Sequence, residues 1–301
     1  MMIQIFSFLN TAVLASVRHI SHSLFPMPHS QKPITNAPHK YEKRYKYIKT
    51  KLITSSVLGL SLLITPAALA DYVPPSDQTE PSDYTGQGGS RDGCEVEGVE
   101  GVERIPLTAL VPLSHVGQTV STRPTLAWFV PNSTRKPMQL RLHKYDSDGT
   151  PQPIGEVISM ESSPGIMAFT LPENGPELKV GQTYLWQVSI ICNPDKESSI
   201  LIAEEDIQVV EKPSDWENML LNRSSASDFY ADEGLWYDAL NEAIKLAEES
   251  RQGEVSSLLE ELITREEEEI KQQELNQREL KNIRRRIENL REIADSLQMN
   301  N

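Results

Sequence analysis

Between residues 94 and 212, apolar side chains recur at every second position within short segments that turn residues separate. The clearest series are Leu126, Trp128 and Val130; Met138, Leu140 and Leu142; and Tyr184, Trp186, Val188 and Ile190. A period of two is typical of strands with one buried face, and turn signals about every ten residues are typical of stacked antiparallel sheets. The pattern predicts an antiparallel β-sandwich over residues 94–212.

A tyrosine near the start of one predicted strand narrows the type of sandwich. Leu178, Gly181 and Tyr184 have the L-x-x-G-x-x-Y spacing of a tyrosine corner, in which the tyrosine hydroxyl bonds to the chain upstream. We therefore expect an immunoglobulin- or fibronectin-like sandwich.

After Pro213 the composition changes to helix-forming residues. Ser214 or Asp215 can cap a first helix and Ser227 a second, and Gly234 and Gly253 separate further helices. Residues 213–264 are predicted to form a helical hairpin region with weak tetratricopeptide character, because only one such unit is visible. The expected fold class is α+β, with strands and helices in separate parts of the sequence.

Residues 265–301 form an acidic tail with a heptad pattern. The apolar positions are spaced by three and four residues, at Leu280, Ile283, Ile287, Leu290, Ala294 and Leu297. Such a seam can pair with another chain or dock on the preceding helices. We expect docking within the chain, and a partner protein bound through the C-terminal helices stays open.

Residues 1–70 have the pattern of an export leader. A basic stretch over residues 43–51 precedes an apolar run from Leu52 to Ile64, and Ala68-Leu69-Ala70 has the small-x-small pattern of a cleavage site. We predict cleavage between Ala70 and Asp71, and Met27 as a candidate for the true start. An uncleaved anchor is the alternative, but the run is shorter than the roughly 20 residues that span a bilayer.

Export has two consequences for the rest of the chain. The protein is expected to be periplasmic or secreted, to meet the membrane only in transit, and to join Cys94 and Cys192 in a disulfide. The alternative is two buried thiols. Residues 71–93, rich in Pro, Gly and Ser, are predicted to be a disordered linker.

The charge balance argues against nucleic acid as a partner. The formal net charge is -14, and residues 1–70 hold eight of the 29 Lys and Arg residues but only one of the 43 Asp and Glu residues. The remaining chain is therefore still more acidic, and an acidic surface repels a phosphate backbone.

We find no pattern of residues that predicts catalysis. Only His115 and His143 remain beyond the leader, and neither accompanies a nucleophile motif or a zinc-ligand pattern. Asp146-x-Asp148-Gly149 begins like a calcium loop, but a plain Asp-Gly turn explains it better. The sequence predicts a protein that is not an enzyme and has no catalytic, metal-binding or cofactor-binding residues.

Several longer strings resemble one known family. They are Gly88-Gly89-Ser90-Arg91-Asp92-Gly93-Cys94, Pro106 to Pro112, Thr119 to Thr125 with Trp128, Val180-Gly181-x-x-Tyr184-x-Trp186, Ile191 to Pro194, and Tyr230 to Leu240. Together, over residues 88–262, they resemble the cyanobacterial domain-of-unknown-function family 928. The resemblance implies an exported protein and supplies no catalytic residue. The chain departs from the family pattern after about Thr264.

Three functional hypotheses follow from these observations. The first is a non-enzymatic protein-interaction or envelope scaffold module, with an unidentified protein as its partner. The second is a sandwich that binds glycan or cell wall through exposed aromatic rings such as Phe129 or Tyr145. A carboxylate-based hydrolase comes third.

Overall fold

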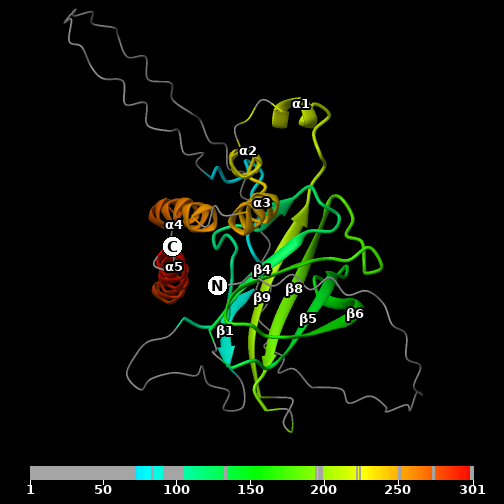
Figure 1. The fold of residues 1–301 in the computed structure, drawn as a ribbon, viewed down its shortest axis with the longest axis vertical. Coiled ribbons are helices and arrows are strands. Elements are labelled where there is room, and N and C mark those ends of the chain that lie inside the picture. Colours follow the sequence, from blue (N-terminus) through cyan, green and yellow to red (C-terminus); the bar gives the residue numbers. More distant parts are fainter. Residues whose placement is uncertain are drawn as a thin grey trace, which may run out of the picture. The chain divides into compact units, whose positions relative to one another are not determined.

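The computed structural model describes residues 72–82, 85–90, 105–131, 134–193, 195, 199–221, 223, 225–249, 253–272 and 275–298 (Figure 1). The strands in this part are β1 (Gly86–Ser90), β2 (Thr108–Ala109), β3 (Gly117–Thr119), β4 (Thr125–Val130), β5 (Pro137–Tyr145), β6 (Pro151–Glu161), β7 (Gly165–Thr170), β8 (Gln182–Ile191) and β9 (Ile200–Val209). The helices are α1 (Trp216–Leu221), α2 (Ala226–Asp232), α3 (Trp236–Glu248), α4 (Glu254–Gln272) and α5 (Gln277–Gln298).

The strands form two sheets. The larger sheet has the order β1-β9-β8-β5-β6, and β3 pairs with β9 in parallel beside it. The smaller sheet has the order β2-β4-β7, and all of its pairs are antiparallel. The antiparallel prediction is therefore correct for every strand pair in the described part except β3 with β9.

The two sheets pack against each other through the side chains that alternate in the sequence. Trp128 of β4 and Trp186 of β8 lie with their ring centroids 6.3 Å apart, and both are fully buried. Along β5, Met138, Leu140 and Leu142 are buried, and the side chains between them point away from this core. The predicted packing of two sheets is confirmed, and the alternation is clearest on β5, where only one face is apolar.

The helices share a core with the sheets. A single cluster of buried apolar residues includes Trp186 of β8, Leu240 of α3, Leu259 of α4 and Leu290 of α5. The predicted α+β class is correct, because the strands precede the helices in the sequence, and in space the two parts share one core. The smaller sheet has three strands and the larger sheet has six. The helices bury apolar surface of the larger sheet that the smaller sheet leaves uncovered.

The heptad tail docks on α4. Ser256 near the start of α4 donates a hydrogen bond to the Ala294 carbonyl near the end of α5 (3.0 Å), so the two helices run in opposite directions. Ile287 and Leu290 are buried, whereas Leu280, Ile283 and Leu297 are partly buried. Docking within the chain is as predicted. The boundary placed at residue 264 is wrong, because α4 continues through it.

Residues 72–82, here called the strap, run without regular secondary structure across several elements. The Val73 N–H bonds to the Ala231 carbonyl of α2 (3.0 Å), and the Ser82 N–H bonds to the Asp206 carboxylate of β9 (2.8 Å). Gly86–Ser90 then pairs with β9. The prediction of a disordered linker over 71–93 is thus wrong for the strap and β1, since contacts that composition cannot reveal order them.

Small corrections apply to the helical region. The side chain of Ser225, and not Ser227, caps α2 by accepting from the Asp228 N–H, whereas the buried Ser227 hydroxyl donates to the Ala239 carbonyl of α3. That bond fixes α2 on α3 as one hairpin, as predicted.

Candidate functional site

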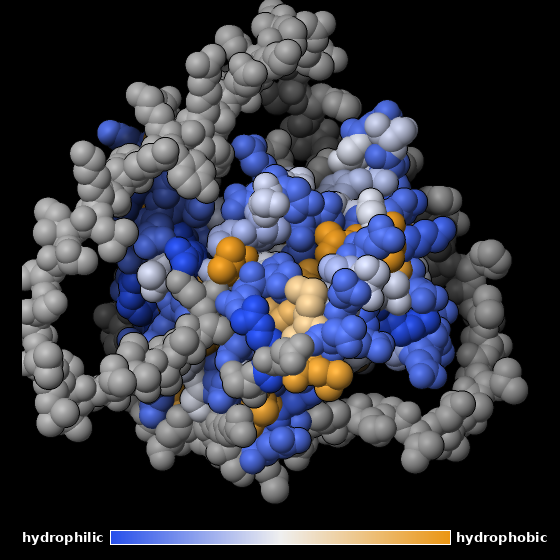
Figure 2. All heavy atoms as spheres, turned by 90° about the horizontal axis from the view of Figure 1, so that it is seen from above, coloured by the Kyte–Doolittle hydropathy of each residue, from blue (hydrophilic) through white to orange (hydrophobic). Residues whose placement is uncertain are grey.

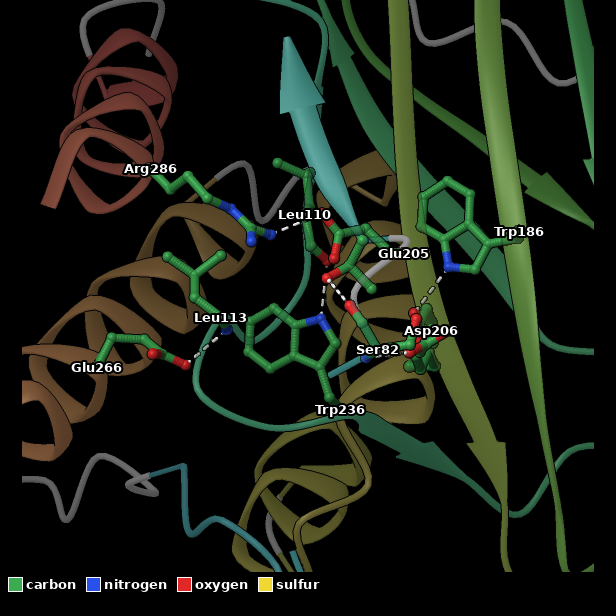
Figure 3. A network of polar contacts seen from close by, with 11 residues as sticks. Ser82, Leu110, Leu113, Trp186, Glu205, Asp206, Trp236, Glu266 and Arg286 are labelled. Atoms are coloured by element: carbon green, nitrogen blue, oxygen red, sulfur yellow. Dashed lines mark hydrogen bonds and ion pairs between the residues drawn. The ribbon is translucent and has the colours of Figure 1, made fainter. Parts of the chain in front are cut away.

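Five buried polar residues gather where the strap, the larger sheet and the helices meet. They are Tyr72, His115, Glu205, Glu266 and Arg286, and we call them the junction. Figure 3 shows Arg286 of α5 directed at Glu205 of β9, and Glu266 of α4 directed at the Leu113 N–H. Tyr72, His115 and Glu266 are each at most 1% exposed.

A chain of hydrogen bonds links the strap to α4. The Tyr72 hydroxyl lies 2.8 Å from His115 Nε2, and His115 Nδ1 lies 3.0 Å from Ser114 Oγ. Ser114 donates to Glu266 Oε1 (3.2 Å). Because the serine proton goes to Glu266, Nδ1 must donate to Ser114, so Nε2 accepts from Tyr72. One tautomer of neutral His115 therefore satisfies all three bonds.

The protonation states agree with this bonding. Burial lowers the pKa of His115 from 6.5 to about 4, so the ring is neutral at pH 7. Burial, and then the charge of Glu266, raises the pKa of Tyr72 well above 10, so the hydroxyl keeps its proton. Burial also raises the pKa of Glu266, while hydrogen bonds from Leu113 and Ser114 and the charge of Arg286 oppose that shift.

An ion pair joins α5 to the inner face of the larger sheet. Arg286 Nη2 lies 2.6 Å from Glu205 Oε1, and the two side chains are 17% and 4% exposed. Glu205 follows Leu201 and Ala203 on the inward-facing side of β9. A charge at such a position is costly unless it is paired, so Arg286 compensates Glu205.

Two adjacent aromatic residues connect α3 to the larger sheet and to the loop before β3. The Trp236 indole N–H donates to the Leu110 carbonyl (2.8 Å), as Figure 3 shows. The Tyr237 hydroxyl accepts from the Trp186 indole (2.8 Å) and donates to the Asp206 carbonyl (3.0 Å). Tyr72 packs edge-on against Trp236, with ring centroids 5.2 Å apart.

The junction is suited to holding elements together. Its members bond one another in the interior, and a general acid or base must instead reach a proton on its substrate. Within the described ranges, no group of three or more His, Cys, Asp or Glu side chains could hold a metal ion. No helix in those ranges is long and apolar enough to cross a membrane.

The residues that the sequence singled out are scattered. Tyr184 accepts a hydrogen bond from the Lys179 N–H upstream (3.0 Å), which is the bond that a tyrosine corner makes. The seam residues Ile287 and Leu290 face α4 and the core. His143 lies on the outer face of β5 and is not one of the junction residues. Its pKa is lowered mainly by burial.

Three sequence predictions cannot be placed. Ala70, Asp71 and Cys94 lie outside the described residues, as does Met27. Cys192 ends its strand partly buried against the core, and its N–H bonds to the Ser199 carbonyl (2.8 Å). The cleavage site, the start codon and the Cys94–Cys192 disulfide therefore stay predictions.

The calcium-like loop is a turn. Asp146 Oδ1 accepts from the Asp148 and Thr150 N–H groups, and its other oxygen accepts from the Gln152 amide. These bonds, first among them that from Thr150, lower the pKa of Asp146. The carboxylate closes its own hairpin, as an aspartate at the first position of a turn usually does.

Sequence reasoning missed most of the junction. Glu205 and Arg286 did carry a signal, because Glu205 falls in phase with the apolar residues of its strand and Arg286 precedes the seam residue Ile287. A charge at a core position on each of two elements suggests a buried pair. Tyr72 carried no such signal, since it lies among linker-like residues.

The fold and the junction define an α+β protein in which a sheet-on-sheet core and a layer of helices are joined by buried polar contacts. The chain belongs to the family described as Domain of Unknown Function (DUF928), whose model matches residues 86–276. The match ends directly before α5, somewhat later than the resemblance predicted. The cyanobacterial source implied by that resemblance stays a prediction. Comparison with curated proteins gave no match.

Proposed function

We propose that the protein is an exported, non-enzymatic scaffold that binds another protein. The observation that carries the proposal is the junction, which joins the strap, the larger sheet, α4 and α5, and α3 shares their apolar core. A rigid body of this kind can present a surface without paying an ordering cost on binding.

The chemistry of the junction supports a non-enzymatic role. His115 is neutral and bonded on both ring nitrogens, and Glu266 accepts from the Leu113 N–H (2.8 Å) as well as from Ser114. Both ring nitrogens of His115 and Oε1 of Glu266 thus already have partners inside the protein, while Oε2 of Glu266 is buried and accepts no hydrogen bond from the described residues. A carboxylate hydrolase is for this reason the least favoured of the three hypotheses.

The placement of the aromatic residues supports a protein partner over a glycan. Trp128, Trp186 and Trp236 are fully buried, so none offers a ring to a sugar. Tyr145 is half-buried, and its hydroxyl bonds to Ser82 and Asp206. Seen from above, the surface is mostly hydrophilic, with apolar side chains in small separate spots (Figure 2).

We infer that the sandwich is immunoglobulin-like. The strand order β9-β8-β5-β6 opposite β2-β4-β7 supports this assignment, and so does the Tyr184 bond at the start of β8. A helical layer that shares the core would be an addition to that type of sandwich.

We also propose export with cleavage between Ala70 and Asp71. Tyr72, the second residue after that bond, is fully buried, so cleavage there would keep this core residue in the mature chain. Mass spectrometry of protein recovered from the periplasm or medium should give a chain that begins at Asp71. A non-reduced digest should contain one peptide pair joined through Cys94 and Cys192. Recovery only from the cytoplasm, with the leader intact, would contradict export.

The scaffold role is tested by binding. The immobilised protein should retain a protein from an envelope extract, and that partner, once purified, should bind saturably in calorimetry. Leu221 of α1 is 82% exposed, and Leu221→Ser provides a surface variant that leaves the core intact. Retention on purified peptidoglycan with no protein bound, or turnover of a cell-wall substrate, would instead favour the glycan or hydrolase hypothesis.

A further inference from the structure

Helix α5 carries a second stripe besides its apolar seam. Its members are charged, are all exposed, and are spaced by three and four residues: Arg278, Lys281, Arg285, Glu288, Glu292 and Asp295. At 3.6 residues per turn, this charged stripe lies on the side of α5 opposite to Ile287 and Leu290. Since the seam faces α4, the charged stripe faces solvent.

The order of the charges is self-complementary. Three cations come first and three acids follow. Arg285 and Glu288 lie equally far from the point between Arg286 and Ile287, and the same holds for Lys281 with Glu292 and for Arg278 with Asp295. An antiparallel copy of the helix, related by a twofold axis through that point, therefore brings every cation opposite an acid.

This order is unfavourable for an isolated helix. Four of the five successive pairs along the stripe have like charges at a spacing of three or four residues, which destabilises a helix. Cations in the first half and acids in the second also oppose the helix dipole. Within the described part of the chain, Arg278, Lys281 and Arg285 form no ion pair. Of the acids, Glu288 pairs with Arg291 of the same helix (3.3 Å) and Glu292 also has a partner, so the three cations are the part of the stripe that a contact outside the chain explains better.

We propose that α5 pairs antiparallel with α5 of a second copy, through the charged stripe, to form a twofold-symmetric dimer. An extended anionic partner, such as a lipid surface or a nucleic acid, would contact the acidic half of the stripe as well as the basic half, and the acidic half would repel it. Only a partner with the inverted order satisfies both halves, and a second copy has it. Such a contact is isologous and closed, so it stops at two copies.

The dimer should be weak and sensitive to salt, because exposed ion pairs contribute little individually and are screened. Sedimentation of the purified protein over a range of concentrations should show dimers at low ionic strength. Its dissociation constant should rise at least tenfold between roughly 0.01 M and 1 M salt, where the screening length falls from about 30 to 3 Å.

Charge reversal gives the decisive test. Arg278→Glu/Lys281→Glu/Arg285→Glu makes the stripe acidic, and Glu288→Lys/Glu292→Lys/Asp295→Lys makes it basic. Each variant alone should be monomeric at low salt, and an equimolar mixture should form a heterodimer at least as tight as the wild-type dimer. A mixture of folded variants that stays monomeric would overturn the proposal, as would a monomeric wild type at low salt.

Milder variants control for position and for folding. Lys281→Glu should weaken the dimer at least tenfold, and Lys281→Glu/Glu292→Lys should restore it, because each changed residue then faces the other in the second copy. Arg284→Glu makes the same change of charge on the same exposed helix, but its symmetry mate is the neutral Asn289. Arg284→Glu should therefore weaken the dimer less than Lys281→Glu does. An equal weakening would show that only the net charge of the helix matters.

This inference does not rest on the scaffold role. A monomeric protein could still bind a partner, and a dimer could lack one. Because α5 lies beyond the family match, the pairing would be a property of this chain and not of the family as a whole.

Discussion

At the scale of single residues, His115 makes the stability of the protein depend on pH. Its folded-state pKa of about 4 lies below the ordinary 6.5, so the neutral ring is favoured by folding. That contribution is complete above pH 6.5 and is lost as the pH falls toward 4. Burial raises the pKa of Asp238 to about 6, so its contribution has the opposite sign and is lost as the pH rises from 3.8 toward 6.

Replacing His115 by Gln should remove one of these contributions. The amide can still meet the Tyr72 hydroxyl, but it does not titrate. The decrease in unfolding free energy between pH 7 and pH 4 should be smaller in His115→Gln by about 3 kcal/mol, for a shift of roughly 2.5 pKa units. Urea unfolding over this pH range measures it. Asp238 is present in both proteins and cancels in the difference, so parallel curves would contradict the assignment.

The Arg286–Glu205 pair gives a second prediction at this scale. Arg286→Met should destabilise the protein by about 3–5 kcal/mol, because it breaks an ion pair with the buried Glu205 carboxylate. Arg286→Met/Glu205→Met should recover most of that loss. Chemical denaturation of the single and double variants at pH 7 completes the cycle. Additive losses would mean that the two charges do not depend on each other.

Single residues also mark the limit of prediction from the sequence. The alternation on β5 and β8 placed Leu140 and Trp186 correctly, since strand geometry forces neighbours to opposite faces. The contact between Tyr72 and His115 could not be predicted, because 43 residues separate them and no periodicity relates the strap to the sheet.

At the scale of elements, the strap shows how order arises without regular secondary structure. It is held by backbone and side-chain bonds to α2, β3 and β9 and by the close approach of Gly234. Composition correctly indicated that the strap would form neither helix nor strand. It could not indicate order, which depends on partners more than 100 residues away such as Asp206.

Gly234 tests how tightly the strap is held. Its φ is +76°, and a Cβ there would lie 2.9 Å from the Pro75 nitrogen and 3.0 Å from the Val73 carbonyl oxygen. Gly234→Ala should therefore cost more than the roughly 1–2 kcal/mol of a left-handed alanine, and should speed hydrogen exchange of the Val73 amide.

Gly149→Ala is the matched control for that variant. Gly149 has nearly the same φ (+75°) and nothing within 4 Å of a Cβ. It should show the backbone cost alone and leave the Val73 amide protected. Equal losses in the two variants would show that the strap moves aside at no cost.

At the scale of the whole molecule, the shared core predicts that α5 cannot be removed cleanly. A chain that ends at Asn276 loses the buried Ile287, Leu290 and Ile293, worth about 1.5–3 kcal/mol each, and loses the Arg286–Glu205 ion pair. We expect a loss of at least about 5 kcal/mol and fast hydrogen exchange along α4. Circular dichroism should show a loss of helix greater than the 22 residues of α5. A loss limited to α5, with α4 still protected, would contradict this.

The sequence predicted each layer better than it predicted how the layers pack on one another. Period-two and heptad patterns each describe one element, so they placed the sandwich and the seam of α5. The packing of one element on another depends on shape and on isolated residues such as Tyr237. Its hydrogen bonds to Trp186 and Asp206 produce no periodic pattern in the sequence.

The distance along the chain between the strap and its partners also determines the order in which contacts form during folding. Tyr72 is held by Arg265, which follows it by 193 residues, and β1 pairs with β9 at the end of the sheet region. Contacts between such remote positions form slowly, because a long loop must close first. The strap residues, which are synthesised before the sheet and the helices, are therefore among the last to take their final positions. The proposed cleavage between Ala70 and Asp71 would then act on a segment that is still extended.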